Sequence, residues 1–364
     1  MSGQWGNYLR VSIYGESHGP AIGITIDGLP SGLPLDLDAI AFEMARRAPG
    51  RNSLSTQRQE ADTPRILSGL YRGRTTGTPL SATIANTGAH SGDYGEELDL
   101  LRPGHADYTG HVRYGGFEDH HGGGHFSGRI TAPLVFCGAV CKQILRRHGI
   151  DVYAHVAALG GIQDARLLDV PTGDLRLPEL AKEVLPLLDP AKRKPMEQAI
   201  DAARMEGDSL GGVIECGIFG VPAGLGAPFF DSAESVIAHL LFSVPAVKGV
   251  EFGLGFAMAA LRGSQCNDEF YLEGDAVKTR TNRGGGIQGG ITCGMPVVFR
   301  AAVRPTASIH REQQTVSLVR HREEPIQTGG RHDPCIVPRA VPVIEGVAAM
   351  AMVELLKERA AWGI

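Results

Sequence analysis

Every second residue is apolar in two segments near the start of the chain, residues 9–13 and residues 22–26. A period of two places these side chains on one face of a strand, so the pattern predicts two strands joined across residues 15–19. Short strands are also expected over residues 64–70 and 80–86. The beginning of the chain therefore favours an antiparallel sheet.

Longer apolar segments predict helices. Residues 130–148 are apolar almost all round and end at Gly149, which is typical of a helix buried on every side. Asp36 or Asp38 can cap another helix that runs to about Arg47, before Pro49-Gly50. The other expectations are helices over 176–188, 190–206 and 232–242, a closing amphipathic helix from Pro342, strands over 150–160 and 213–219, glycine-interrupted strands over 249–262 and 286–303, and a polar loop over 310–330.

These elements do not alternate as regular strand–helix–strand units. The order favours an α+β fold over a doubly wound parallel sheet. Neither a linker nor an internal repeat divides the chain, apart from two glycine triplets at 122–124 and 284–286. We therefore expect one domain over residues 1–364.

Composition narrows the class of protein. The chain has 364 residues, 43% of them hydrophobic and 21% charged, with a formal net charge of −5. These values are ordinary for a soluble enzyme, and they give no basic field for nucleic acid or an anionic membrane. No apolar run reaches membrane-spanning length, no signal peptide is apparent, and the six cysteines show no disulfide or zinc spacing. We expect a cytoplasmic protein.

Arginine and histidine are distributed unevenly. Residues 1–141 hold eleven arginines and no lysine, and five of the 13 histidines lie within 105–125. Codon bias in a GC-rich genome would explain part of the arginine excess. The glycines around the histidines predict a loop rather than a helix or strand. Guanidinium groups bind oxyanions and imidazoles titrate near neutral pH, so this region is expected to handle an anionic small molecule.

Several short motifs carry candidate chemistry, and each has an alternative. Gly15-Glu16-Ser17-His18-Gly19 matches the hydrolase pattern G-x-S-x-G, but a strand pattern follows where that motif requires a helix. Arg102-Pro103-Gly104-His105-Ala106-Asp107 places an imidazole beside a cation and a carboxylate, and its alternative is a surface turn. His120, His121 and His125 could ligate a metal, although Gly122–Gly124 disfavour the helix that such spacing needs.

The C-terminal third adds three further candidates. Residues 281–291 are glycine-rich but lack the dinucleotide-binding spacing. Arg304-Pro305-Thr306-Ala307-Ser308 supplies a cation and two hydroxyls suited to phosphate. Gly330-Arg331-His332-Asp333-Pro334-Cys335 gathers charge beside a turn, with Arg339 within reach. A structural turn is the alternative for each.

In series, these segments resemble the chorismate synthase family. The matching segments are 15–19, Arg46-Arg47, Thr56-Gln57-Arg58, 102–107, Ser127-Gly128-Arg129, Val247-Lys248-Gly249-Val250-Glu251, Leu261-Arg262-Gly263-Ser264, Gly285-Gly286-Ile287, Arg304-Pro305-Thr306 and 330–335. They span nearly the whole chain in the family's order.

The resemblance implies a fold, an activity and an assembly. The implied fold is a β-α-β sandwich with helices between outer antiparallel sheets. The implied reaction is the 1,4-trans elimination of phosphate from 5-enolpyruvylshikimate 3-phosphate, which gives chorismate and needs reduced FMN without net oxidation. The implied assembly is a homotetramer, and we expect an external NAD(P)H-dependent flavin reductase to supply the reduced FMN.

The resemblance also implies roles for individual residues. His18 would protonate the departing phosphate, His105 would protonate the reduced flavin or balance its charge, and Asp333 would take part in removing the C6 proton. The implied substrate-binding residues are Arg47, Arg51, Arg102, Arg129 and Arg339. The implied flavin-binding residues are Ser127, Ala246, Gly289, Arg304, Pro305, Thr306, Ala307, Ser308 and Arg331. No metal is implied.

Three positions depart from the commonest family pattern. His125-Phe126-Ser127-Gly128-Arg129 replaces Arg-Ser-Ser-Ala-Arg, Pro245-Ala246 replaces Asn-Ala, and Ser53 stands where an arginine is usual, with Arg51 the nearest substitute. Two other classes of function remain open, namely a metal-dependent hydrolase built on the histidine cluster and a non-catalytic flavin- or phosphate-binding protein.

Overall fold

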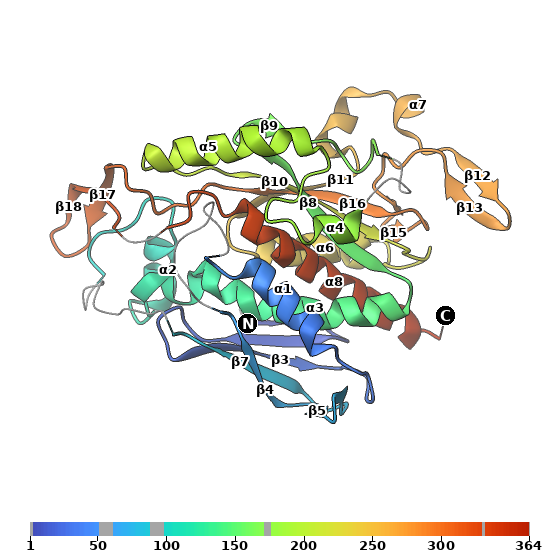
Figure 1. Ribbon diagram of the computed structural model, residues 1–364, viewed down its shortest axis with the longest axis horizontal. Coiled ribbons are helices and arrows are strands. Elements are labelled where there is room, and N and C mark those ends of the chain that lie inside the picture. Colours follow the sequence, from blue (N-terminus) through green and yellow to red (C-terminus); the bar gives the residue numbers. More distant parts are fainter. Residues whose placement is uncertain (1–2, 51–60, 88–97, 171–175, 330–331, 364) are drawn as a thin grey trace.

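Two antiparallel sheets enclose a layer of helices in the computed structural model (Figure 1). The structure describes residues 3–50, 61–87, 98–170, 176–329 and 332–363. The arrangement is α+β, which confirms the predicted class. Each sheet buries one face against the helices, as the alternating apolar positions require.

The first sheet contains the two strands predicted near the start of the chain. Its order is β1 (Gln4–Trp5), β2 (Arg10–Tyr14), β3 (Ala21–Asp27), β7 (Leu80–Ala85) and β4 (Pro64–Ser68). In the register, Ile24 lies opposite Ile13 on one side and Ala82 on the other. Ile22, Ile24 and Ile26 are buried beneath the helices, so the period of two correctly identified the inner face.

The second sheet is formed by strands from the middle and later parts of the chain. Its order is β11 (Val247–Phe252), β16 (Val297–Val303), β10 (Gly212–Phe219), β8 (Asp151–Leu159) and β9 (Ile162–Gln163). The expected strand over 249–262 ends at Phe252, because Gly253 and Gly255 take positive φ values and turn the chain into a 3₁₀ segment. The expected strand over 286–303 is divided into β14 (Ile287–Gln288), β15 (Ile291–Thr292) and β16.

The helix layer contains α1 (Leu37–Arg47), α3 (Thr131–Arg147), α6 (Ala233–Ser243) and α8 (Val337–Ala361). The Asp36 side chain caps α1, and α3 is buried along most of its length, as predicted. A Cβ added to Gly138 would lie 2.2 Å from the Cα of Gly346, so α3 and α8 cross with almost no space between their backbones. The last helix begins five residues before the expected Pro342, because a proline already fits the first turn at Pro338.

A buried ionic cluster joins three of these helices. Glu345 of α8 accepts from Lys142 of α3 at 2.6 Å and from the Arg46 guanidinium of α1. It also accepts from the backbone N–H of Ala154 in β8 at 2.9 Å, and Glu43 bonds to both cations at 2.7 Å. Burial alone would raise the pKa of Glu345, but Arg46 and Lys142 outweigh it and hold the pKa well below its usual value.

Several expectations about the connecting segments were wrong. The polar stretch 310–330 forms a hairpin of β17 (Gln313–Ser317) and β18 (Arg322–Ile326) rather than a loop, because its side chains alternate across a paired ladder. The histidine-rich stretch includes α2 (Asp107–Tyr114), which ends at left-handed Gly115. Only α4 (Leu177–Leu180) forms within 176–188, where Pro186 interrupts the pattern.

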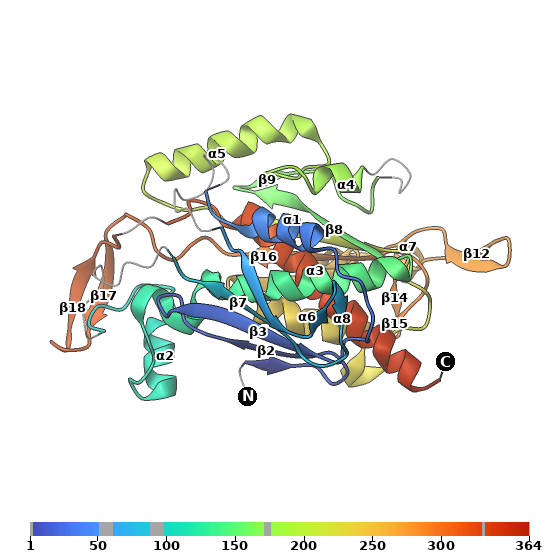
Figure 2. The ribbon, with the colours of Figure 1, turned by 60° about the horizontal axis from the view of Figure 1, so that its bottom comes forward.

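The remaining elements lie outside the sandwich. The predicted helix over 190–206 is α5 (Arg193–Met205), which lies beyond the second sheet, away from the helix layer (Figures 1 and 2). A hairpin of β12 (Phe270–Glu273) and β13 (Ala276–Thr279), which the sequence did not suggest, projects at one end with α7 (Gly263–Cys266) nearby, while α2 and the β17–β18 hairpin lie at the other end (Figure 2). Strands β5 (Leu70–Tyr71) and β6 (Arg74–Thr75) form a small ribbon. None of the described helices has the length and apolar character to cross a bilayer.

Candidate active site

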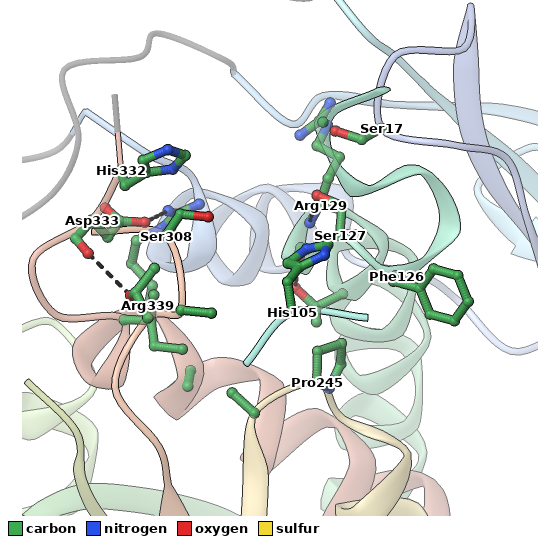
Figure 3. A pocket seen from close by; sticks show the side chains of 18 of the residues that line it. Ser17, His105, Phe126, Ser127, Arg129, Pro245, Ser308, His332, Asp333 and Arg339 are labelled. Carbon is green, nitrogen blue, oxygen red and sulfur yellow. Dashed lines mark hydrogen bonds and ion pairs between the residues drawn. The ribbon is translucent and has the colours of Figure 1, made fainter. Parts of the chain in front are cut away.

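A cavity of about 280 Å³ lies where several distant parts of the chain meet, including the end of α1 and residues 244–246. The strand-end turn at 15–19, the start of α2, the 122–129 loop, the 304–308 segment and the N-terminal turn of α8 all contribute to it (Figure 3). It is lined by fourteen of the residues named from the sequence: His18, Arg47, Arg102, His105, Ser127, Arg129, Ala246, Arg304, Pro305, Thr306, Ala307, Ser308, Asp333 and Arg339.

Three of the named residues are not in this set. Gly289 lies in the turn between β14 and β15 with a φ of 62° and does not line the cavity. Arg51 and Arg331 lie outside the described residues.

The turn that carries His18 is held by hydrogen bonds from a side-chain amide to its backbone carbonyls. The amide of Asn86, just after β7, donates to the carbonyls of Glu16 and Gly19 at 2.9 and 2.8 Å. Strand β3 begins directly after the turn, so no helix follows Ser17 as a serine hydrolase would require. The turn therefore presents His18 at the edge of the first sheet.

His105 belongs to a compact charged group at the start of α2. Its Nδ1 lies 2.6 Å from the Asp107 carboxylate, which also accepts from the Arg102 guanidinium at 2.7 and 2.8 Å. Burial would raise the pKa of Asp107, but the hydrogen bonds from Arg102 and His105 prevail and lower it far below its usual value. The carboxylate at Nδ1 fixes the orientation of the ring and leaves Nε2 as the atom that can face a ligand.

The glycine triplet 122–124 lies against both histidines. A Cβ added to Gly122 would lie 2.0 Å from Cε1 of His18, and one added to Gly123 would lie 3.0 Å from Nε2 of His105. All three glycines have positive φ values, between 51° and 86°. Residues with a Cβ would fit neither the space nor the backbone, which explains the glycine density noticed in the sequence.

Arg47 and Arg129 share one buried carboxylate, that of Asp62, which bonds to both guanidinium groups. Burial would raise the pKa of Asp62, but the two arginines lower it below its usual value. Burial lowers the pKa of Arg47 from its usual value, although Asp62 opposes this change. Two residues of this site, Asp62 and Asn86, could not be found from the sequence. Asn86 donates to the turn that carries His18 and accepts from Arg129 Nε at 3.0 Å. Neither residue lies near its partners along the chain, so no short motif includes it.

Asp333 and Arg339 face the cavity from the start of α8 and form an ion pair (Figure 3). Thr306 donates to the backbone carbonyl of Asp333 at 3.0 Å, and Arg339 Nε donates to the carbonyl of Arg47 at 2.9 Å. These bonds tie the segment just before α8 to the 304–308 segment, and the first turn of α8 to the end of α1. The aspartate is therefore fixed opposite the histidines.

Arg304 differs from the other arginines of the cavity. Arg47, Arg102, Arg129 and Arg339 each pair with a carboxylate, whereas Arg304 makes no ion pair with any described residue. Its backbone N–H donates to the carbonyl of Ala246 at 2.9 Å. Its charge is therefore available to an anion, next to the hydroxyls of Thr306 and Ser308.

The other histidines of the cluster make local contacts. His120 and His121 stack with ring centroids 4.5 Å apart, and His121 Nδ1 lies 2.6 Å from Asp119. Within the described ranges, no three metal-ligating side chains are placed to share one ion. The hypothesis of a metal-dependent hydrolase gains no support from this geometry.

The cavity combines two kinds of surface. Five arginines and three histidines line it, together with apolar side chains of Val244, Pro245, Ile336, Ala340 and Val343. The charged part suits a molecule with several anionic groups, and the apolar part suits a flat ring. The fold and the site together define an α+β enzyme with proton-transfer groups in a polyanion-binding cavity.

Comparisons with known proteins identify the family. Residues 9–356 match the family model described as chorismate synthase. The chorismate synthase of Thermococcus kodakarensis is 44% identical over 357 residues, covering 98% of both chains. That of Aeropyrum pernix is 45% identical over 356 residues, covering 98% of this chain and 93% of the relative. A crystal structure of chorismate synthase superposes with a TM-score of 0.76 at 30% identity, covering 98% of this chain and 93% of the other.

The chain therefore belongs to the chorismate synthase family. Its activity is that of a chorismate synthase, a carbon–oxygen lyase of the shikimate pathway. The resemblance stated from the motifs is confirmed.

Proposed function

We propose that this cavity catalyses the 1,4-trans elimination of phosphate from 5-enolpyruvylshikimate 3-phosphate to give chorismate, with reduced FMN as a cofactor that undergoes no net oxidation. The observation that carries the proposal is the convergence of His18, His105 and Asp333 on one arginine-lined cavity. In this reaction the carbon–oxygen bond to phosphate and the C6–H bond break, and a second ring double bond forms.

The lining fits a flavin with an anionic tail. Arg304 offers a cation that pairs with no carboxylate in the part of the chain that the structure describes, and Thr306, Ser308 and Ser127 offer hydroxyls suited to a phosphate. The apolar wall beside Pro245 and Ala246 suits a planar ring system. When bound, reduced FMN would supply electron density to the breaking carbon–oxygen bond. We include Gly289 and Arg331 as flavin contacts on the family resemblance alone.

The chain's own residues divide the proton and charge chemistry. We assign to His18 the proton given to the departing phosphate, and to His105, oriented by Asp107, a proton held at Nε2 toward the flavin. Asp333, fixed by Arg339, takes part in removing the C6 proton. Arg47, Arg102, Arg129 and Arg339 oppose the charges of the phosphate and carboxylates. Arg51 is retained as a substrate contact on its position in the sequence.

We further propose a homotetramer in which residues 1–364 form one domain. The two sheets pack on one shared helix layer, which supports a single domain. Large aromatic side chains are exposed on the surface, with Phe229 at 85%, Phe230 at 92% and Phe256 at 85%. Such residues are typical of interfaces between subunits. We place the enzyme in the cytoplasm, where an external NAD(P)H-dependent reductase would supply reduced FMN.

The proposal is tested by an anaerobic assay with chemically reduced FMN and 5-enolpyruvylshikimate 3-phosphate. We expect phosphate release and chorismate formation in equal amounts. The variants His18→Ala and His105→Ala should each lower turnover by about 10²–10⁴-fold, because each removes a general acid. Circular dichroism and the melting temperature should remain those of the wild type.

Flavin binding without phosphate release by the folded wild-type protein would contradict the proposal and favour a non-catalytic flavin-binding protein. Wild-type rates in both histidine variants would refute the assigned roles while leaving the reaction in place.

A further inference from the structure

Two hydrogen bonds join the turn that carries His18 to the glycine loop. The backbone N–H of Ser17 donates to the carbonyl of Gly124 at 3.0 Å. In the other direction, Nδ1 of His125 lies 2.8 Å from the carbonyl of Gly15. The bonds attach the first and third residues of the turn to adjacent residues of the loop, so neither segment can slide along the other while both bonds hold.

The second of these bonds fixes a proton on the imidazole. A carbonyl oxygen can only accept a hydrogen bond, so Nδ1 of His125 must be the donor. His125 is only partly buried and does not line the cavity. Its side chain therefore acts at the back of the loop, outside the space that substrate and flavin would occupy.

The loop held in this way lies against both catalytic candidates. Gly122 contacts the ring of His18, and Gly123 contacts Nε2 of His105. A displacement of the loop from the turn would open the space beside His18 and alter the distance between the loop and His105. Displacements of about 1 Å in an active site can cost up to about a hundredfold in rate.

We propose that His125 is a positioning residue for His18, acting through the Nδ1–H that it donates to the Gly15 carbonyl. The activity part of this inference depends on the proposed function, whereas the contact between turn and loop does not. From the sequence alone, His125 is a candidate metal ligand and a departure from the family pattern.

Two substitutions of His125 distinguish the effect of its hydrogen bond to Gly15 from the effect of having a polar side chain at this position. In His125→Asn, the side-chain amide N–H can occupy the place of Nδ1 and donate to Gly15. In His125→Gln, the amide lies one bond farther out, near the place of Nε2, and cannot make the same bond. The glutamine variant is therefore the matched control for the asparagine variant.

The first readout is independent of catalysis. Hydrogen exchange of the Ser17 amide, followed by mass spectrometry of a peptide spanning residues 15–19, reports whether the turn remains attached to the loop. We expect wild-type exchange in the asparagine variant and exchange about tenfold faster in the glutamine variant, as for the loss of one hydrogen bond. Peptides from β10 and β16 should be unchanged in both variants.

The second readout is turnover. We expect kcat to fall about tenfold in the glutamine variant with KM within about twofold of the wild type, and the asparagine variant to keep the wild-type kcat. Equal behaviour of the two variants, in either direction, would overturn the inference, as would faster exchange throughout the glutamine variant. If the wild type lacks turnover but the Ser17 amide responds as described, the proposed function fails and the attachment of the turn by His125 stands.

Discussion

Single atoms determine how closely the two histidines approach the loop beside them. Gly122 and Gly123 have no side chains, and each contacts one imidazole through the space that a Cβ would fill. Their backbone φ values are positive, which also requires glycine at these two positions. At this scale the site depends as much on where atoms are missing as on which functional groups are present.

Gly122→Ala tests this dependence. The added Cβ would lie 2.0 Å from Cε1 of His18, so the ring must move. We expect turnover to fall by about a hundredfold in steady-state assays, since a catalytic group displaced by about 1 Å has that effect. Gly263→Ala is the control, because a Cβ there meets nothing within 4 Å and the backbone is unstrained. Equal turnover in the two variants would show that His18 tolerates displacement.

The candidate residues could be predicted from the sequence, but most of their partners could not. Histidine, arginine and glycine are conspicuous when they cluster, and fourteen of the named residues line the cavity. Asp62 and Asn86 gave no such signal, because each acts on residues more than ten positions away. A buried carboxylate shared by two arginines becomes visible only when the chain is folded.

At the scale of elements, the strongest packing constraint is the crossing of α3 and α8. Both helices are apolar on nearly all sides and meet at Gly138 and Gly346. The hydrophobic pattern identified α3 as buried on every side, because such burial removes polar residues from the whole surface. The same pattern predicted an amphipathic last helix, whereas α8 is buried along most of its length. The pattern missed the β12–β13 and β17–β18 hairpins because they project from the sandwich, where no buried face imposes a hydrophobic period.

The two glycines at the crossing differ in the space around them. Gly138→Ala would place a Cβ 2.2 Å from the Cα of Gly346, and we expect the free energy of unfolding to fall by about 2 kcal/mol or more. In Gly346→Ala the nearest atom is 3.4 Å away, an ordinary contact. Alanine there should be neutral or favourable because of its helix propensity. Chemical denaturation of both variants measures the difference, and a stable Gly138→Ala protein would show that the crossing can widen.

The whole molecule separates its charges by depth. The net charge of −5 describes the chain overall, while the cavity is lined by arginines and the helix layer contains a closed ionic cluster. Three carboxylates that face these cations, Asp62, Asp107 and Glu345, have lowered pKa values. A carboxyl group with a lowered folded pKa stabilises the folded protein above its unfolded pKa, and this stabilisation is lost as the pH falls through the folded value.

Glu345→Gln should show this linkage most clearly. Removing the buried charge leaves Glu43 to balance both Arg46 and Lys142, so one buried cation loses its counter-charge and we expect a loss of about 3 kcal/mol in the free energy of unfolding at pH 7. The difference from the wild type should shrink as the pH falls from about 4.5 towards the folded pKa of about 2, because the carboxyl group of the unfolded chain is protonated in this range while the folded one is still ionised. Glu324→Gln, which breaks only surface ion pairs, should change stability little. Denaturation curves at several pH values provide the measurement, and a pH-independent deficit would contradict the linkage.

The shared carboxylate of Asp62 has a consequence for how the cavity would recognise an anionic ligand. Because Arg47 and Arg129 are both anchored to one buried point, neither can swing outward to meet an arriving anion. Their rotational freedom is already lost when the chain folds, so none remains to be lost on binding. The cavity would therefore discriminate between two anions of equal charge by their shape.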